Sequence, residues 1–123
     1  MTDLSIAFSP CPNDTFIFHA MLHHGIDTGS YTFSPHIDDV EALNNAAFKK
    51  TFQITKLSFF AYLLLKEDYE LLDSGSALGF GCGPLLVTGK KSTFSADSRI
   101  AIPGNYTTAF LLLKLWNPEI RNI

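Results

Sequence analysis

A short apolar run, cut off by two closely spaced prolines, opens this chain and limits the folds available to it. Residues 4–8 (Leu-Ser-Ile-Ala-Phe) have the length and composition of a buried strand. Pro10 and Pro12 follow, and regular structure cannot continue through them because each fixes φ and lacks an N–H. A helical pattern over residues 14–24 comes next, with Gly25 as a left-handed cap. A strand, a rigid turn and a helix in this order are typical of an α/β fold whose turn presents polar groups to a ligand.

Strand and helix patterns then alternate along the chain. The predicted strands cover residues 4–8, 31–37, 52–56, 85–88 and 99–102, with a weaker pattern at 69–72. The predicted helices cover residues 14–24, 38–50, 59–66 and 107–116. This alternation predicts a largely parallel sheet with helices on both faces. Pro35 places the second strand at a sheet edge or at a bulge.

Polar residues with capping chemistry stand before the predicted helices. Asn13 or Asp14 supplies the side-chain oxygen for the first helix, and Asp38 followed by Glu41 resembles a capping box for the second. Ser58 caps the third helix, whose apolar residues surround it and predict burial on most sides.

The composition excludes several classes of protein. The 123 residues suit one ordinary domain, and 46% hydrophobic with 17% charged residues is a globular composition. A net charge of −3, with lysine pairs at residues 49–50 and 90–91 in place of a basic stripe, argues against nucleic acid as a partner. The wholly apolar run at residues 59–65 is too short to span a membrane.

The start of the chain and its cysteines indicate a cytoplasmic protein. Met1, Thr2 and Asp3 do not form the basic start of a signal peptide. Cys11 and Cys82 cannot build a disulfide framework, so we expect both to stay reduced.

Three predicted strand-to-helix loops, at residues 9–14, 55–58 and 103–108, fall on one edge of such a sheet, because right-handed crossovers place them there. Lys56 could offer a positive charge to an anion, and Ser58 a hydroxyl, but from the residues alone an exposed lysine beside a capping serine is the stronger interpretation. Thr107 and Thr108 suit a carboxylate or hydroxyl ligand, or form a plain helix cap.

Ser9, Asn13 and Asp14 line the same predicted edge, where they contact a ligand or only organise the turn. His19 and His23 stand four apart on a helix, a spacing that permits metal binding, but a third ligand is not evident. We therefore predict no metal site.

Five stretches together carry a resemblance to a known family. They occur in family order over nearly the whole chain, at residues 9–16 (Ser-Pro-Cys-Pro-Asn-Asp-Thr-Phe), 38–41 (Asp-Asp-Val-Glu), 55–58 (Thr-Lys-Leu-Ser), 79–84 and 103–110. In these stretches the chain resembles the 1,4-dihydroxy-6-naphthoate synthase family of menaquinone biosynthesis. The resemblance implies a cofactor-free lyase that converts the small molecule cyclic dehypoxanthine futalosine to 1,4-dihydroxy-6-naphthoate. The alternative, from a different class, is a non-catalytic domain, similar to solute-binding proteins, that captures a small carboxylate.

The resemblance also implies an α/β, periplasmic-binding-protein-like (type II) two-lobed fold, here truncated. Residues 1–88 would form most of the first lobe, and residues 89–123 the crossing segment and the start of the second. The missing C-terminal half would be the partner of this chain and would carry the family's histidine base, beyond Ile123. The implied substrate-binding residues are Lys56, Leu57, Ser58, Thr107 and Thr108. We expect this chain to be inactive alone.

Overall fold

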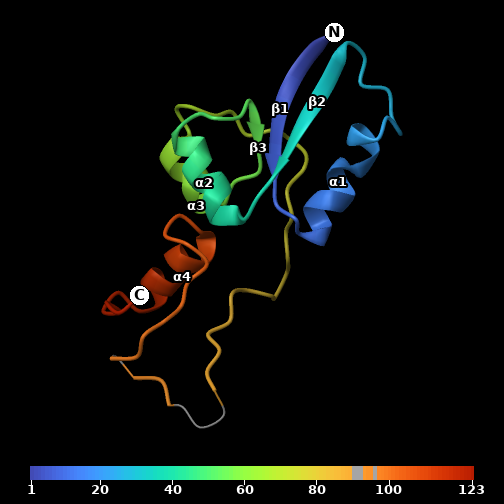
Figure 1. The fold of residues 1–123 in the computed structure, drawn as a ribbon. Coiled ribbons are helices and arrows are strands. Elements are labelled where there is room, and N and C mark those ends of the chain that lie inside the picture. The colour runs from blue at the N-terminus through green and yellow to red at the C-terminus, as the bar shows by residue number, and fades with distance from the viewer. Residues whose placement is uncertain (90–92, 96) are drawn as a thin grey trace.

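A computed structural model describes residues 1–89, 93–95 and 97–123. In chain order the elements are β1 (Thr2–Phe8), α1 (Pro12–Leu22), β2 (Tyr31–Ile37), α2 (Val40–Phe48), β3 (Ile54–Thr55), α3 (Phe59–Leu65) and α4 (Thr108–Trp116). Figure 1 shows the three strands between α1 on one side and α2 with α3 on the other. The predicted strand-and-helix alternation is confirmed for the first 65 residues and for the last helix.

The sheet is parallel and has the strand order β2-β1-β3. The chain crosses from β1 to β2 through α1 and then back past β1 to β3 through α2. Because parallel crossovers are right-handed, these two opposite crossings put α1 and α2 on opposite faces of the sheet. The predicted parallel sheet is confirmed, and Pro35 lies in an edge strand, paired in register with Ile6.

The third strand is shorter than predicted because side chains replace part of its backbone pairing. Gln53 accepts the backbone N–H of Ser5 through Oε1 at 2.9 Å, and its own N–H donates to Ser5 Oγ at 3.0 Å. These bonds extend the contact between the two strands beyond Ile54–Thr55, so the predicted strand over residues 52–56 keeps only its centre as regular sheet.

The core lies where the end of β1 meets the helices. Ile6, Ala7 and Phe8 are almost fully buried, and the Phe8 ring lies 4.9 Å from that of Phe18 on α1. The other buried apolar residues are Leu43 and Ala47 on α2, Ala61 and Leu65 on α3, and Ile120. Burial of β1 therefore fixes the position of the turn that follows it.

Both ends of α1 differ from the prediction. The helix begins at Pro12, a residue suited to the first helical position, and Cys11 rather than Asn13 or Asp14 is its N-cap. At its other end His24, not Gly25, adopts the left-handed conformation, with φ of 57°. Gly25 instead passes close to α1, where its N–H donates to Ala20 O at 2.7 Å. The glycine is favoured by this close approach rather than by its φ.

The helix α2 begins one residue later than the predicted capping box. Asp39 is the N-cap and accepts from the N–H groups of Glu41 and Ala42 at 2.9 and 3.0 Å. The predicted cap Asp38 is exposed and lies 3.6 Å from His36. Glu41 does not bond back to the cap, because its carboxylate is held by Tyr106 and Asn44, as described below.

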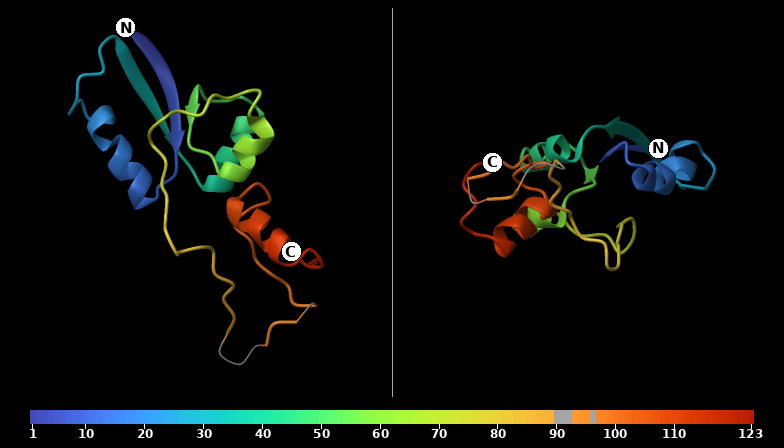
Figure 2. Two further views of the ribbon diagram at one scale, coloured as in Figure 1. Left: turned by 180° about the vertical axis from the view of Figure 1, so that it is seen from behind. Right: turned by 90° about the horizontal axis from the view of Figure 1, so that it is seen from below.

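The predicted strands at residues 69–72, 85–88 and 99–102 do not form in the structure. Residues 78–89 follow an irregular path away from the sheet (Figures 1 and 2). Leu85 and Val87 are 86% and 82% exposed. A strand requires a hydrogen-bonding neighbour, and no described strand runs beside these residues. Part of the predicted linker over residues 90–98 lies outside the described residues.

The two last helices pack together but expose much of their apolar surface. α3 contacts α4, while Leu63 and Leu64 on its other side are 59% and 54% exposed. The predicted burial of α3 on most sides is therefore wrong, since Phe59, Leu63 and Leu64 are each at least half exposed. The helices in the described part of the chain are all too short, or too polar, to cross a membrane.

Candidate functional site

A cavity of about 1060 Å³ is lined by Ile6 of β1, Phe33 of β2 and the residues before and after β3. Its walls come from one side of α1, from residues 50–59, from residues 68–77 and from the start of α4. Lys56, Leu57, Ser58 and Thr108 line it, whereas Thr107, Ser9, Asn13 and Asp14 do not. The structure thus brings four of the five predicted substrate-binding residues together.

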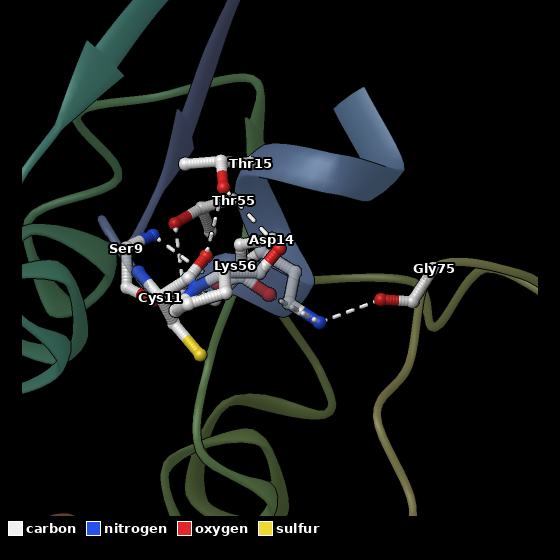
Figure 3. A network of polar contacts seen from close by, with 8 residues as sticks. Ser9, Cys11, Asp14, Thr15, Thr55, Lys56 and Gly75 are labelled. Carbon is white, nitrogen blue, oxygen red and sulfur yellow. Dashed lines mark hydrogen bonds and ion pairs between the residues drawn. The ribbon is translucent and has the colours of Figure 1, made fainter. Parts of the chain in front are cut away.

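The carboxylate of Asp14, in the first turn of α1, holds the turn between β1 and α1. Asp14, only 7% exposed, accepts from Ser9 Oγ at 2.8 Å and from Ser9 N–H at 3.2 Å through Oδ2 (Figure 3). Its negative charge lies in the first turn of α1, where the helix dipole stabilises it. Asp14 and Ser9 therefore hold each other in this turn, and Asn13 is exposed on the helix surface.

Lys56 reaches from the end of β3 to two other parts of the chain. Its backbone N–H donates to Ala7 O at 2.8 Å, which fixes it beside β1. Its ammonium lies 3.5 Å from Asp14 Oδ1 and donates to Gly75 O at 2.5 Å (Figure 3). Since an ammonium has three donor hydrogens, these contacts leave one for an oxygen in the cavity. The side chain is 23% exposed, so a ligand in the cavity can reach it.

Ser58 is the N-cap residue of α3 by position, but its side chain makes no capping bond. Its N–H donates to Asn44 Oδ1 and its Oγ accepts from Asn44 Nδ2, both at 3.1 Å. The hydroxyl serves as the acceptor in this bond, so its own hydrogen can be donated to a further group. The predicted side-chain cap at Ser58 is wrong, because Asn44 holds this residue instead.

The two threonines at the start of α4 point to different surroundings. Thr107 is 4% exposed; its Oγ1 donates to Gly104 O at 2.8 Å and accepts from Phe110 N–H at 3.3 Å. Thr107 is therefore a helix cap, one of the two interpretations that its position allowed. Thr108 Oγ1 accepts from Phe60 N–H at 3.4 Å and lines the cavity.

Several groups at the site carried no recognisable signal in the sequence. Lys50 lies 2.6 Å from Asp68 at the cavity wall, and the hydrogen bond and charge of Asp68 raise the pKa of Lys50. Burial, together with the neighbouring charge of Asp68, raises the pKa of Tyr69, which also lines the cavity. Asp68 and Tyr69 come after the end of α3 in an irregular stretch, so only the fold brings them to Lys50.

The histidines do not line the cavity. The rings of His19 and His23 lie 4.4 Å apart on α1, and His36 stacks on Phe52. None of the described residues that line the cavity is a histidine. Within the described part of the chain, no group of three or more His, Cys, Asp or Glu side chains is arranged for a metal ion. The expected lack of a metal site stays a prediction.

Comparison with known proteins places the chain in a family. The family described as menaquinone biosynthesis matches residues 4–123. Two curated relatives are named 1,4-dihydroxy-6-naphthoate synthase. The one from Thermus thermophilus is 43% identical over 94% of this chain and 42% of its own length. The one from Streptomyces coelicolor is 38% identical over 92% of this chain and 40% of its own length.

A solved structure agrees with this relationship. The X-ray structure of a protein from Archaeoglobus fulgidus superposes with a TM-score of 0.84 at 43% identity, over 93% of this chain and 42% of that one. The chain thus spans about two fifths of the length of the relatives that it matches. Since the match runs from the first strand to the last residue, the chain belongs to the menaquinone biosynthesis family that includes these naphthoate synthases.

Proposed function

We propose that the chain provides the N-terminal part of a 1,4-dihydroxy-6-naphthoate synthase. The observation that carries this proposal is the 43% and 38% identity to two proteins of that name along 94% and 92% of the chain. The proposed reaction is that of a lyase acting on cyclic dehypoxanthine futalosine: a proton is removed and the sugar-derived part is split off. A cytoplasmic location fits this role and the two free cysteines, Cys11 and Cys82.

The chemistry of the cavity supports an aromatic substrate with oxygen substituents. Its walls are mainly apolar, with Phe18, Phe59 and Tyr62 among them, which suits a flat ring system. Lys56, Ser58 and Thr108 add hydrogen-bonding groups at one part of this wall, where they would fix the orientation of a carboxylate or hydroxyl. Leu57 is an apolar neighbour in the same loop.

The base that removes the proton is proposed to lie outside this chain, on a histidine beyond Ile123. We also keep the two-lobed, periplasmic-binding-protein-like type II fold as a proposal, with residues 1–88 in the first lobe and 89–123 leading into the second. The parallel sheet with the order β2-β1-β3, and the cavity that reaches the loop after β3, are compatible with such a lobe.

Complementation tests the activity. The chain is incubated with cyclic dehypoxanthine futalosine alone, and again with the part of the Thermus thermophilus relative that this chain does not match. Mass spectrometry should detect 1,4-dihydroxy-6-naphthoate only in the mixture, because general-base catalysis contributes about 10²–10⁴-fold. Product from the chain alone would disprove the assignment of the base. Binding of naphthoate without product in the mixture would favour the non-catalytic alternative.

Two threonine variants test the site. Thr108→Val should weaken binding of 1,4-dihydroxy-6-naphthoate by about 2–10-fold, the effect of one neutral hydrogen bond. Thr107→Ser, which keeps the capping hydroxyl, is the matched control and should bind as the parent does. Equal calorimetric affinities of all three proteins would remove Thr108 from the site.

A further inference from the structure

One chain of hydrogen bonds joins the two candidate binding segments, and it runs through α2, which does not line the cavity. It passes from Ser58 to Asn44, from Asn44 to Glu41 and from Glu41 to Tyr106. Ser58 belongs to the segment 56–58, and Tyr106 directly precedes Thr107 and Thr108. We refer to Glu41 and Asn44 as the α2 bridge.

Asn44 is the buried centre of this bridge. Its side chain is fully buried, and each of its polar atoms has a partner. Nδ2 donates to Ser58 Oγ and to Glu41 Oε2, both at 3.1 Å, while Oδ1 accepts from Ser58 N–H. Because Ser58 N–H can only donate, the orientation of the amide is determined by its surroundings. A buried amide satisfied in this way keeps the serine in one position relative to α2.

Glu41 holds the other segment through its backbone. Tyr106 N–H donates to both carboxylate oxygens, at 3.2 Å to Oε1 and 3.3 Å to Oε2. Gly104 makes this contact possible: a Cβ there would lie 2.2 Å from Glu41 Cδ, and its φ of +153° also disfavours a side chain. The turn at residues 104–106 is therefore shaped around the carboxylate.

We propose that the α2 bridge is a positioning device that sets the spacing of Ser58 and Thr108 in the cavity wall. This inference rests on the proposed function, in which both residues contact the ligand. Glu41 and Asn44 do not line the cavity, so they act through the residues that they hold. A direct contact from Phe60 N–H, in the first turn of α3 just after Ser58, to Thr108 Oγ1 at 3.4 Å needs that spacing to be kept. Ligand affinity should therefore depend on two residues that the ligand does not touch.

Amide hydrogen exchange and ligand affinity test the proposal in the 123-residue chain. Asn44→Ala should reduce the protection of the Ser58 amide from exchange by about tenfold, and Glu41→Ala should do the same for the Tyr106 amide. They should also weaken binding of 1,4-dihydroxy-6-naphthoate by about tenfold. The amide of Lys56, which donates to Ala7 O in the core, is the internal reference and should keep its protection. A general loss of stability would instead lower the protection of the Ser58, Tyr106 and Lys56 amides together.

Asn45→Ala is the matched control, because Asn45 is the same residue type on the same helix, is exposed, and bonds only to Glu41 O in its own helix. It should change neither readout. If Asn44→Ala does not fold, Glu41→Gln is used as the test variant. The glutamine amide keeps one acceptor oxygen, so this variant should reduce Tyr106 protection and ligand affinity less than Glu41→Ala does.

Retained protection at Ser58 and Tyr106 in the variants would overturn the proposal, as would lost protection with unchanged affinity. A parent chain that does not bind naphthoate would count against the proposed function, and the exchange results alone would then decide whether the bridge holds the two segments.

Discussion

The run at residues 4–8 and the run at residues 85–88 are both short, apolar and rich in strand-forming residues, yet only the first forms a strand. The first forms β1, with Ile6, Ala7 and Phe8 at 1%, 0% and 2% exposure. The second is irregular, with Leu85 and Val87 at 86% and 82% exposure. The first run has β2 and β3 on its two sides. The comparison teaches that an apolar run becomes a strand only where neighbouring strands satisfy its backbone.

The largest expected effect is in the first run. Phe8→Ala should lower the free energy of unfolding by about 3–5 kcal/mol, because it removes a buried ring and leaves a cavity against Phe18. Urea denaturation followed by circular dichroism measures it. An unchanged midpoint would mean that β1 is not the centre of the core.

The turn after β1 should show the next largest effect. Asp14→Ala leaves Ser9 N–H and the part-buried Lys56 without their carboxylate, at a cost of about 1–3 kcal/mol. Asp38→Ala is the control, since Asp38 is exposed and its contact with His36 is worth about 0–1 kcal/mol. Equal losses in the two variants would show that the Asp14 network does not stabilise the turn.

The group formed by Lys50, Asp68 and Tyr69 should stabilise the fold less at alkaline pH. The pKa of Lys50 is raised by its hydrogen bond to Asp68, and that of Tyr69 is raised by burial. Both groups hold their proton more firmly when folded, so their stabilisation is present below the unfolded pKa values of about 10–10.5 and is lost as pH rises through the folded ones. Melting temperatures from pH 8 to 11.5 should fall, and should fall less in Tyr69→Phe. If the melting temperatures of the parent and of Tyr69→Phe fall equally with pH, a contribution from Tyr69 is excluded.

The smallest effect belongs to the second run. Leu85→Ser and Val87→Ser should change the free energy of unfolding by no more than about 0.5 kcal/mol, because both side chains are already exposed. Urea titrations of these variants beside Phe8→Ala complete the comparison. A loss above 1 kcal/mol would show that residues 85–88 are paired in solution.

Sequence patterns identified most of the regular elements where local chemistry and packing agree. β1, β2 and α4 follow their predicted ranges closely; Pro10 follows the end of β1, and Thr107 caps α4. The cap of α1 was mispredicted, because Asp14 is used three positions inside the helix to bind Ser9. Local rules assign a capping role to the nearest oxygen and cannot see which partner competes for it.

The candidate site was predictable in part for a similar reason. Lys56 and Ser58 follow β3 at the predicted sheet edge. Thr108 also lines the cavity, although the strand predicted before it, at residues 99–102, does not form. Asn44, Glu41 and Asp68 could not be found in this way, since each acts through a partner far along the chain. Whether the predicted residues contact substrate stays a prediction.

The central place of β1 in the sheet also has a consequence for how the protein is made. β1 leaves the ribosome before either of its partners, because it pairs with residues 29 positions later in β2 and 48 positions later at β3. At synthesis rates of about 5–20 residues per second, β1 waits for roughly 2–10 s before both neighbours exist. During that interval its apolar side chains are open to other chains and to chaperones. Nascent chains that end shortly before Ile54 are therefore expected to be the species most prone to aggregation during synthesis.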